Sequence, residues 1–285
     1  MSTRPSTPTP RRTRPRAART ALVPALAAAA ALAVAGAGAV AAPAAAHGDR
    51  HGHDRGTLRV ATYNASLNRA AAGELEADLS TPDDPQAATI AEVLQRTRPD
   101  VVLLNEFDYV PGERAVDLFR DHYLEVPQGG AEPIEYRYAY VAPSNTGVPS
   151  GFDLNDDGVV GGGDDAFGFG AFEGQYGMVV LSRYPIDTRG VRTFQHFLWK
   201  DMPGALLPDD PATPAPADWF TPEELDVVRL SSKSHWDVPV RVGRQTVHVL
   251  ASHPGSYRHL RAHEPCAALG CRLLLEKNRG GGGGG

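Results

Sequence analysis

The sequence predicts an α/β fold, and three features of its first structured part indicate this class. Residues 57 to 64 alternate apolar and other side chains with a period of two, which is typical of a strand. Asp84 and Pro85 form a helix start, and an apolar stripe at helical spacing follows until Pro99. Residues 100 to 104 form a short apolar run, typical of a buried strand. This order predicts two strands of one sheet whose polar ends are exposed together.

The rest of the chain continues with strands and helices, interrupted by two long irregular segments. We expect a second helix over residues 116 to 124, strands over 135 to 141 and 176 to 182, and a hairpin of residues 238 to 242 and 245 to 252. The glycine-rich segment 144 to 174 is a loop of a length that is uncommon unless it is functional or disordered. Residues 202 to 222 are rich in Pro, Asp and Ala and predict an exposed excursion.

Residues 1 to 46 have the pattern of a signal peptide. Six arginines and no acidic residue precede an apolar run of Ala, Val and Leu, and the small residues up to Ala46 fit a cleavage site. A retained membrane anchor is the alternative, because a run of about 20 residues can just span a bilayer. We expect the leader to be removed, residues 47 to 56 to be a disordered mature N-terminus, and the mature protein to be secreted, extracellular and not bound to a membrane.

The composition limits the partners of the mature protein. The chain has 28 basic and 34 acidic side chains, and six of the basic ones lie in the leader. This acidic balance argues against tight nonspecific binding to nucleic acid, which we expect only as a substrate. Cys266 and Cys271 allow one local disulfide and exclude a disulfide framework in the main body. We expect a monomer.

Two polar residues follow the first two predicted strands. Asn64 and Glu106 each stand at the carboxyl end of a strand, where functional groups gather in open α/β sheets. A carboxylate and an amide oxygen are hard ligands that suit Mg²⁺. The alternative for each residue alone is a turn residue or a solvated side chain.

Four segments occur in a fixed order and carry a family resemblance. They are residues 58 to 64 (LRVATYN), 99 to 106 (PDVVLLNE), 176 to 185 (YGMVVLSRYP) and 250 to 254 (LASHP). Together they resemble the endonuclease/exonuclease/phosphatase superfamily, whose relatives include pancreatic deoxyribonuclease, sphingomyelinases and inositol phosphatases. The resemblance covers about residues 57 to 254, which we take as one partial domain of this kind.

The resemblance implies a fold and a set of roles. The fold would be a four-layer sandwich of two mixed sheets flanked by helices, incomplete at its C-terminus. Glu106 would be the carboxylate for Mg²⁺ (or Mn²⁺), with Asn64 beside it to help fix the metal and the attacking water. His253 would act on the scissile phosphate as a hydrogen-bond donor or acid, and Tyr176 and Gln175 would line the cleft. Such metal-assisted hydrolysis requires no covalent nucleophile.

A fifth segment resembles the secreted branch of the same family. In residues 230 to 237 (LSSKSHWD), Lys233 and His235 are candidates for contacts with the substrate phosphate. The alternative is a solvated loop before a strand.

The sequence departs from the family pattern after Pro254. The Gly-Asp-x-Asn and Ser-Asp-His segments that the family would supply have no counterpart in residues 255 to 285, which end in six glycines. We expect this tail to be disordered and to result from a frameshift or premature termination that leaves the domain without stable packing or activity. The alternative is a natural linker-like tail on a smaller fold.

The long loop contains a pattern typical of calcium-binding loops. Its spacing matches ligand positions 1, 3, 5, 7 and 12, with Gly158 at the sharp turn, and the residues are Asp153, Asn155, Asp157, Val159 and Asp164. The predicted role is structural, and the alternative is an acidic flexible loop without an ion.

These observations predict a secreted, metal-dependent phosphoesterase acting on phosphate monoesters or diesters through a metal-activated water. The alternative from another class is a noncatalytic, calcium-binding secreted fragment of such an enzyme.

Overall fold

The first two predicted strands lie side by side at one edge of a mixed sheet. The computed structural model describes residues 57–210 and 212–254. Strand β1 (Val60–Leu67) pairs in parallel with β2 (Val101–Phe107), as the strand, helix and strand order predicts. Strands β4 (Met178–Ser182) and β3 (Tyr138–Val141) extend the sheet with antiparallel pairing, in the order β1-β2-β4-β3. The predicted strands are confirmed, although β1, β3 and β4 begin two or three residues later than expected.

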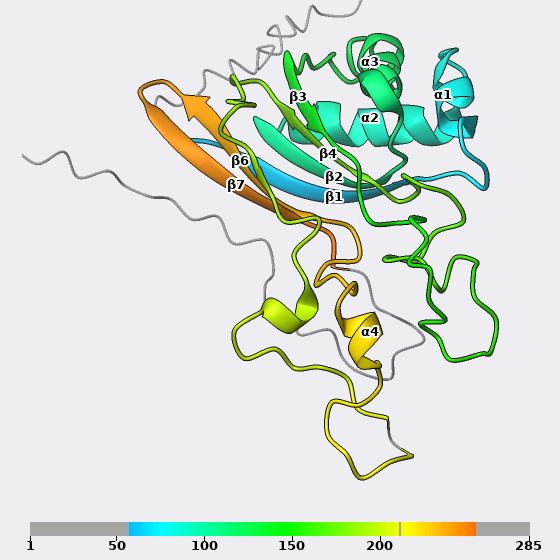
Figure 1. Ribbon diagram of the computed structural model, residues 1–285. Coiled ribbons are helices and arrows are strands. Elements are labelled where there is room, and N and C mark those ends of the chain that lie inside the picture. The colour runs from blue at the N-terminus through cyan, green and yellow to red at the C-terminus, as the bar shows by residue number, and fades with distance from the viewer. Residues whose placement is uncertain (1–56, 211, 255–285) are drawn as a thin grey trace, which may run out of the picture. The chain divides into compact units, whose positions relative to one another are not determined.

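The helices between residues 74 and 124 lie on one side of this sheet (Figure 1). Helix α2 (Pro85–Thr97) begins where the sequence predicts, because the Asp84 carboxylate accepts a 2.7 Å hydrogen bond from the backbone N–H of Ala87. The predicted second helix is present as α3 (Arg114–Phe119), which continues as a π-helical turn, η2 (Arg120–Leu124). Helix α1 (Glu74–Leu79) was not predicted, because it is too short for its two buried leucines to form a visible period.

A second sheet contains β5 (Arg192–Thr193), β6 (His235–Val242) and β7 (Gln245–Ser252), in that order. The predicted hairpin is confirmed, since β6 and β7 pair from Val242 and Gln245 onward and Gly243 has a φ of 62° at the two-residue turn. The first sheet is mixed, whereas the described strands of the second sheet are all antiparallel.

Alternate side chains of the first sheet enter two different cores. Val102, Leu104, Val179 and Leu181 pack against the helices, while Val101, Leu103, Met178 and Val180 pack against the second sheet. Trp236 of β6 lies in this second core with its ring edge-on to Tyr140, at 5.0 Å between centroids. The described residues therefore form three layers, helices, mixed sheet and antiparallel sheet, and the fourth layer stays a prediction.

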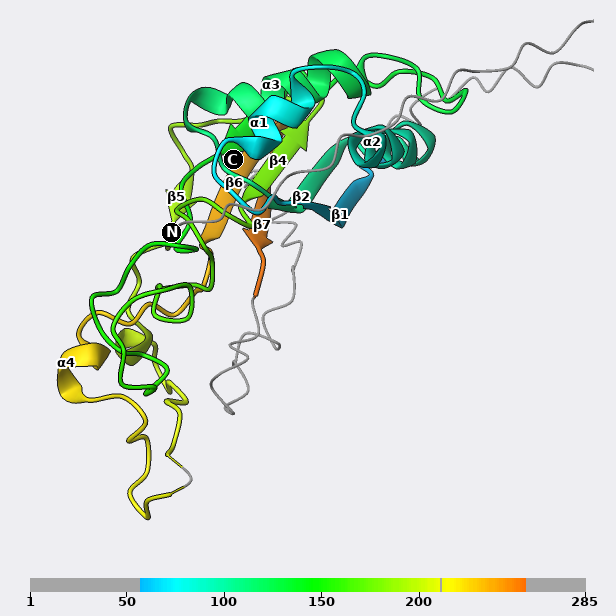
Figure 2. The same cartoon turned by 90° about the vertical axis from the view of Figure 1, so that its right-hand side faces the viewer.

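The two irregular segments are folded together beyond one end of the sheets, where α4 (Pro222–Leu225) also lies (Figure 2). Isolated bridges join Thr146 to Gly168 and Pro149 to Ala166 within the long loop. Leu154 of this loop shares a small buried cluster with Trp199, Phe220 and Val228. The prediction of an exposed excursion over 202 to 222 is therefore wrong for Phe220, which is buried in the cluster.

Several predictions concern parts of the chain outside the described residues. These are the signal peptide (1–46), the mature N-terminus (47–56), and the tail (255–285) with its two cysteines. In the part that the structure describes, no helix is both long enough and apolar enough to cross a membrane.

Candidate functional site

Five strand ends meet at one end of the two packed sheets. Because β1 and β2 are parallel, their carboxyl ends lie side by side, with Asn64 opposite Asn105. Asn105 is opposite Met178 at the start of the antiparallel strand β4. In the second sheet, His235 at the start of β6 is opposite Ser252 at the end of β7. Loops from both sheets are thus brought to the same place.

Glu106 and Asn64 are linked through Ser66. The Ser66 hydroxyl oxygen lies 3.3 Å from Asn64 Oδ1 and 3.4 Å from Glu106 Oε2, so its single proton can be donated to either acceptor. Ser66 lies in an irregular part of β1, between Asn64 and Leu67, where the register with β2 shifts. Ser66 and Glu106 both have left-handed backbone conformations, with φ of 48° and 58°. Such strained conformations in non-glycine residues cost about 1 kcal/mol or more and cluster at functional sites.

His253 brings the end of β7 to Glu106. Its Nε2 lies 3.9 Å from Glu106 Oε1, while its Nδ1 is buried without a hydrogen-bond partner among the described residues. Burial lowers the pKa of His253 to about 4, the charge of Lys233 lowers it as well, and Glu106 acts in the opposite direction. The imidazole of the metal-free protein is therefore neutral at pH 7.

Lys233 and Tyr176 lie together, and the positive charge of Lys233 acts on His253. Lys233 is only 7% exposed, and its Nζ is 5.5 Å from the centre of the Tyr176 ring. Tyr176 has a left-handed φ of 55° just before β4. His235 lies two residues after Lys233, its Nε2 is buried without a hydrogen-bond partner in the described part of the chain, and burial lowers its pKa.

A buried carboxylate that sequence reasoning missed, Asp108, fixes the loop before β4. Asp108 accepts hydrogen bonds from the backbone N–H groups of Tyr176, at 2.9 Å, and Arg69, at 2.7 Å. Burial raises the pKa of Asp108 to about 6, against the opposing effect of these hydrogen bonds. The buried Gln175 amide donates to the Arg69 carbonyl at 2.7 Å and accepts from the N–H of Ala171 at 2.7 Å. These bonds favour a role for Gln175 in holding the loop rather than in contacting substrate.

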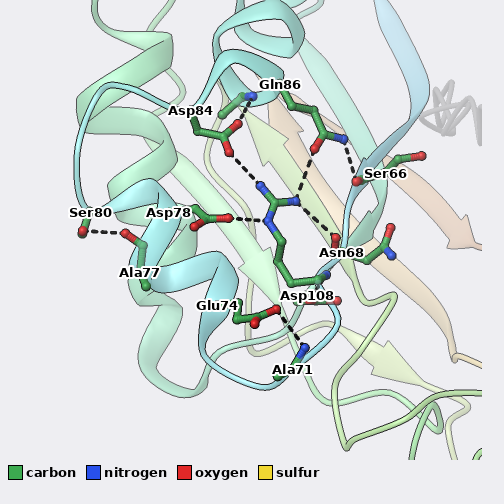
Figure 3. A network of polar contacts seen from close by, with 12 residues as sticks. Ser66, Asn68, Ala71, Glu74, Ala77, Asp78, Ser80, Asp84, Gln86 and Asp108 are labelled. Carbon is green, nitrogen blue, oxygen red and sulfur yellow. Dashed lines mark hydrogen bonds and ion pairs between the residues drawn. The ribbon is translucent and has the colours of Figure 1, made fainter. Parts of the chain in front are cut away.

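The Arg69 side chain anchors the end of β1 to the helices. Asp78, Asp84 and Gln86 converge on its guanidinium, at 2.5, 2.9 and 3.3 Å (Figure 3). The Gln86 amide also donates a 2.7 Å hydrogen bond to the carbonyl of Ser66. The network therefore connects the strand end that carries Asn64 and Ser66 to the start of α2.

The donor set at Glu106 fits an open magnesium site. One carboxylate and one amide oxygen are available there, and Mg²⁺ typically uses one or two carboxylates and keeps water and phosphate as its other ligands. Among the described residues there is no group of three or more His, Cys, Asp and Glu side chains that could enclose a metal ion. Glu106 and Asn64 could therefore hold only part of the shell of an ion.

The first half of the predicted calcium loop is organised by its own polar side chains. Asp153 accepts hydrogen bonds from the N–H groups of Asp157, at 3.1 Å, and Gly158, at 2.7 Å. Asn155 accepts from the same Asp157 N–H at 3.1 Å, and Asp157 accepts from the N–H of Val159 at 2.8 Å. The side chains of Asp153, Asn155 and Asp157 thus hold the backbone of residues 153 to 159 in a tight turn.

The second half of this loop is closed by the neighbour of the predicted ligand. Asp164, the expected last ligand, is half-buried. The adjacent Asp165 is buried and accepts hydrogen bonds from the N–H groups of Leu154, at 2.8 Å, and Gly161, at 2.7 Å. Sequence spacing alone did not indicate Asp165.

Comparison with solved structures finds related proteins of low similarity. An endonuclease/exonuclease/phosphatase from Beutenbergia cavernae DSM 12333 is 22% identical with a TM-score of 0.34, and the match covers 70% of this chain and 39% of that chain. An endonuclease/exonuclease/phosphatase family protein from Leptotrichia buccalis C-1013-b is 11% identical with a TM-score of 0.33, over 70% of this chain and 54% of that chain. The chain thus matches well under two thirds of either protein.

Comparison with curated proteins finds no match. The model of the endonuclease/exonuclease/phosphatase family matches residues 61–273, which include β2, β4, β6, β7 and all of β1 except Val60, with all the strand ends described above. Since this match covers most of the sequence, the chain belongs to the endonuclease/exonuclease/phosphatase family.

Proposed function

We propose that this chain is a secreted hydrolase of phosphate esters whose active site contains Glu106, Asn64 and His253. The observation that carries the proposal is the 3.9 Å approach of His253 Nε2 to Glu106 Oε1, which joins the ends of strands from two sheets. Family membership supports the reaction class, and the strained backbone at Glu106 supports a functional role for this residue.

Each residue has a task in hydrolysis. Glu106 and Asn64 would hold Mg²⁺ (or Mn²⁺), which when bound supplies positive charge to the phosphate and lowers the pKa of water. The neutral His253 can hydrogen-bond a phosphate oxygen or the attacking water, and the Lys233 ammonium offsets phosphate charge in a poorly hydrated place. The water oxygen forms a bond to phosphorus as the ester oxygen leaves, and the proton that water loses balances the one that the alcohol gains.

The substrate class in this proposal is a phosphate monoester or diester. A nucleic acid would enter only as a substrate, since the acidic balance of the chain disfavours binding along a polymer of phosphates. We also propose export, with cleavage before His47, which N-terminal sequencing of the protein secreted by a suitable host would test. A retained leader would contradict this part.

Hydrolysis of 4-nitrophenyl phosphate and bis(4-nitrophenyl) phosphate, followed at increasing Mg²⁺, tests the reaction. We expect Glu106→Gln and His253→Ala each to lower kcat/KM by about 100-fold or more, the range for losing electrostatic or acid–base assistance. Glu125→Gln removes the same charge at an exposed position after η2 and serves as the control. Activity that both site variants retain would refute the assignment.

A noncatalytic calcium-binding protein is the second candidate function. It is favoured by the hydrogen bonds that curl residues 153 to 159 around the oxygens of Asp153, Asn155 and Asp157. These oxygens, the Val159 carbonyl and Asp164 would be the Ca²⁺ ligands. Calorimetry should show Ca²⁺ binding that Asp153→Ala abolishes, and equal binding by both proteins would contradict the calcium site.

A further inference from the structure

Phe169 is an exposed aromatic side chain that the proposed chemistry does not use. It lies in the long loop and is 52% exposed, although large apolar side chains are usually buried. Its ring centre is 6.4 Å from that of Tyr176, and the two ring planes differ by 31°. A pair of rings, one of them largely open to solvent, therefore lies next to the candidate active site.

The backbone around Phe169 is held on both sides by close packing. A Cβ atom on Gly168 would lie 1.9 Å from the Ser232 carbonyl oxygen, and one on Gly170 would lie 2.8 Å from the Gly147 nitrogen. The N–H of Phe167 also donates a 2.9 Å hydrogen bond to the Val148 carbonyl. Phe169 thus stands on a backbone that the fold holds in place, so its exposure does not come from a loose loop.

A series of neighbouring side chains connects this ring with the proposed site of hydrolysis. The centre of the Tyr176 ring lies 5.5 Å from Lys233 Nζ, and Lys233 comes two residues before His235, which pairs with Ser252 next to His253. His253 is in turn 3.9 Å from Glu106. A molecule with its phosphate between Lys233 and Glu106 would therefore have its organic part within reach of Tyr176 and Phe169.

We propose that Phe169 and Tyr176 form a ring subsite that binds a flat, unsaturated group attached to the phosphate. The inference rests on the proposed function and deepens it, because it names aryl and heteroaryl phosphate esters as the preferred substrates over aliphatic ones. Flat π systems stack on aromatic side chains in offset or tilted arrangements, whereas a small alkyl group covers little of a ring face.

Binding of two phosphonates to the full chain with Mg²⁺ tests this subsite without turnover. Phenylphosphonate and ethylphosphonate carry the same charged group and cannot release an alcohol, and ligand-observed NMR titration gives both Kd values. We expect the protein to bind phenylphosphonate more tightly. Phe169→Ala and Phe169→Leu should each weaken phenylphosphonate about fivefold to tenfold, as expected for lost stacking, and leave ethylphosphonate unchanged.

The leucine variant keeps apolar bulk and so separates ring stacking from simple apolar contact. Tyr138→Ala is the matched control, since Tyr138 is 36% exposed and pairs with Ser182, at the end of the sheet opposite Glu106. An unchanged preference in Phe169→Ala, or equal weakening of both ligands, would overturn the ring subsite alone. Failure of the unmodified protein to bind either phosphonate would overturn the proposed phosphate site, and the subsite with it.

Discussion

Replacement of Asp108 by Asn should remove a loss of stability that the parent protein suffers as the pH rises. The Asp108 side chain is 3% exposed, and burial raises its pKa from 3.8 to about 6. A folded-state pKa above the unfolded value means that the native protein binds the proton more tightly. The stability that protonated Asp108 contributes is therefore fully present below about pH 3.8, and it is lost as the pH rises through about 6.

The size of the effect follows from the pKa difference. A shift of one pKa unit corresponds to about 1.4 kcal/mol, so ionisation of Asp108 costs the native protein at most about 3 kcal/mol at pH 8. Asparagine is neutral and so avoids this cost, although its NH2 group cannot accept one of the two backbone hydrogen bonds that the Asp108 oxygens accept. The lost hydrogen bond costs the variant a similar amount at every pH, so the unfolding free energy of the variant relative to the parent should rise by about 3 kcal/mol from pH 4 to pH 8.

Urea unfolding at pH 4, 6 and 8 measures this difference. A chelator keeps metal charge away from the neighbouring Glu106, and Asp121→Asn makes the same charge change at an exposed position. A stability difference between Asp108→Asn and the parent that stays constant from pH 4 to pH 8 would refute the reasoning. The carboxylate would then carry no burial penalty, and its hydrogen bonds to Tyr176 and Arg69 would fully offset the loss of water.

Three further substitutions test the packing around the sheets by urea unfolding. Burial alone would raise the pKa of Asp237, but its Arg192 and His248 partners outweigh burial and hold the pKa below the ordinary value. Asp237→Asn should therefore cost about 2 kcal/mol at pH 7 and less as the pH falls below 3.8. An equal loss of unfolding free energy at neutral and at acidic pH would contradict the lowered pKa of Asp237. Gly168→Ala should lower the unfolding free energy by about 1 to 3 kcal/mol, because the new Cβ would lie 1.9 Å from the Ser232 carbonyl oxygen. An unchanged unfolding free energy would show that the backbones at Gly168 and Ser232 move apart at little cost. Tyr136→Phe should cost about 1 to 2 kcal/mol by removing the buried 3.0 Å hydrogen bond to the Pro99 carbonyl, and an unchanged midpoint would exclude that contribution.

Local sequence patterns predicted the main elements of the fold. The apolar period of two, the Asp84 and Pro85 helix start and the apolar run before Glu106 correspond to β1, α2 and β2. These patterns are readable because a long element repeats its burial several times along the chain. The two-residue strand β5 and the one-and-a-half-turn helix α1 repeat nothing, so only their neighbours in space define them.

The residues of the candidate site also include some that local sequence patterns predicted and some that they did not. Asn64 and Glu106 were predicted from their places at strand ends, and four ordered segments indicated the family. Ser66 and Asp108 were missed, because Ser66 contacts Glu106 across 40 positions and Asp108 contacts Tyr176 across 68. Nothing in the residues next to either one reveals such a partner.

The sequence by itself determined the α/β class, the succession of the main strands along the chain and the types of side chain at their ends, since these depend on periodicity and local chemistry. Tertiary structure decided that His253, which follows β7 of the second sheet, lies 3.9 Å from Glu106 of the first, and that Lys233 lies over the ring of Tyr176. The physical reason is that two sheets pack through side chains far apart in sequence, such as Leu103 and Trp236, and only this packing aligns their ends.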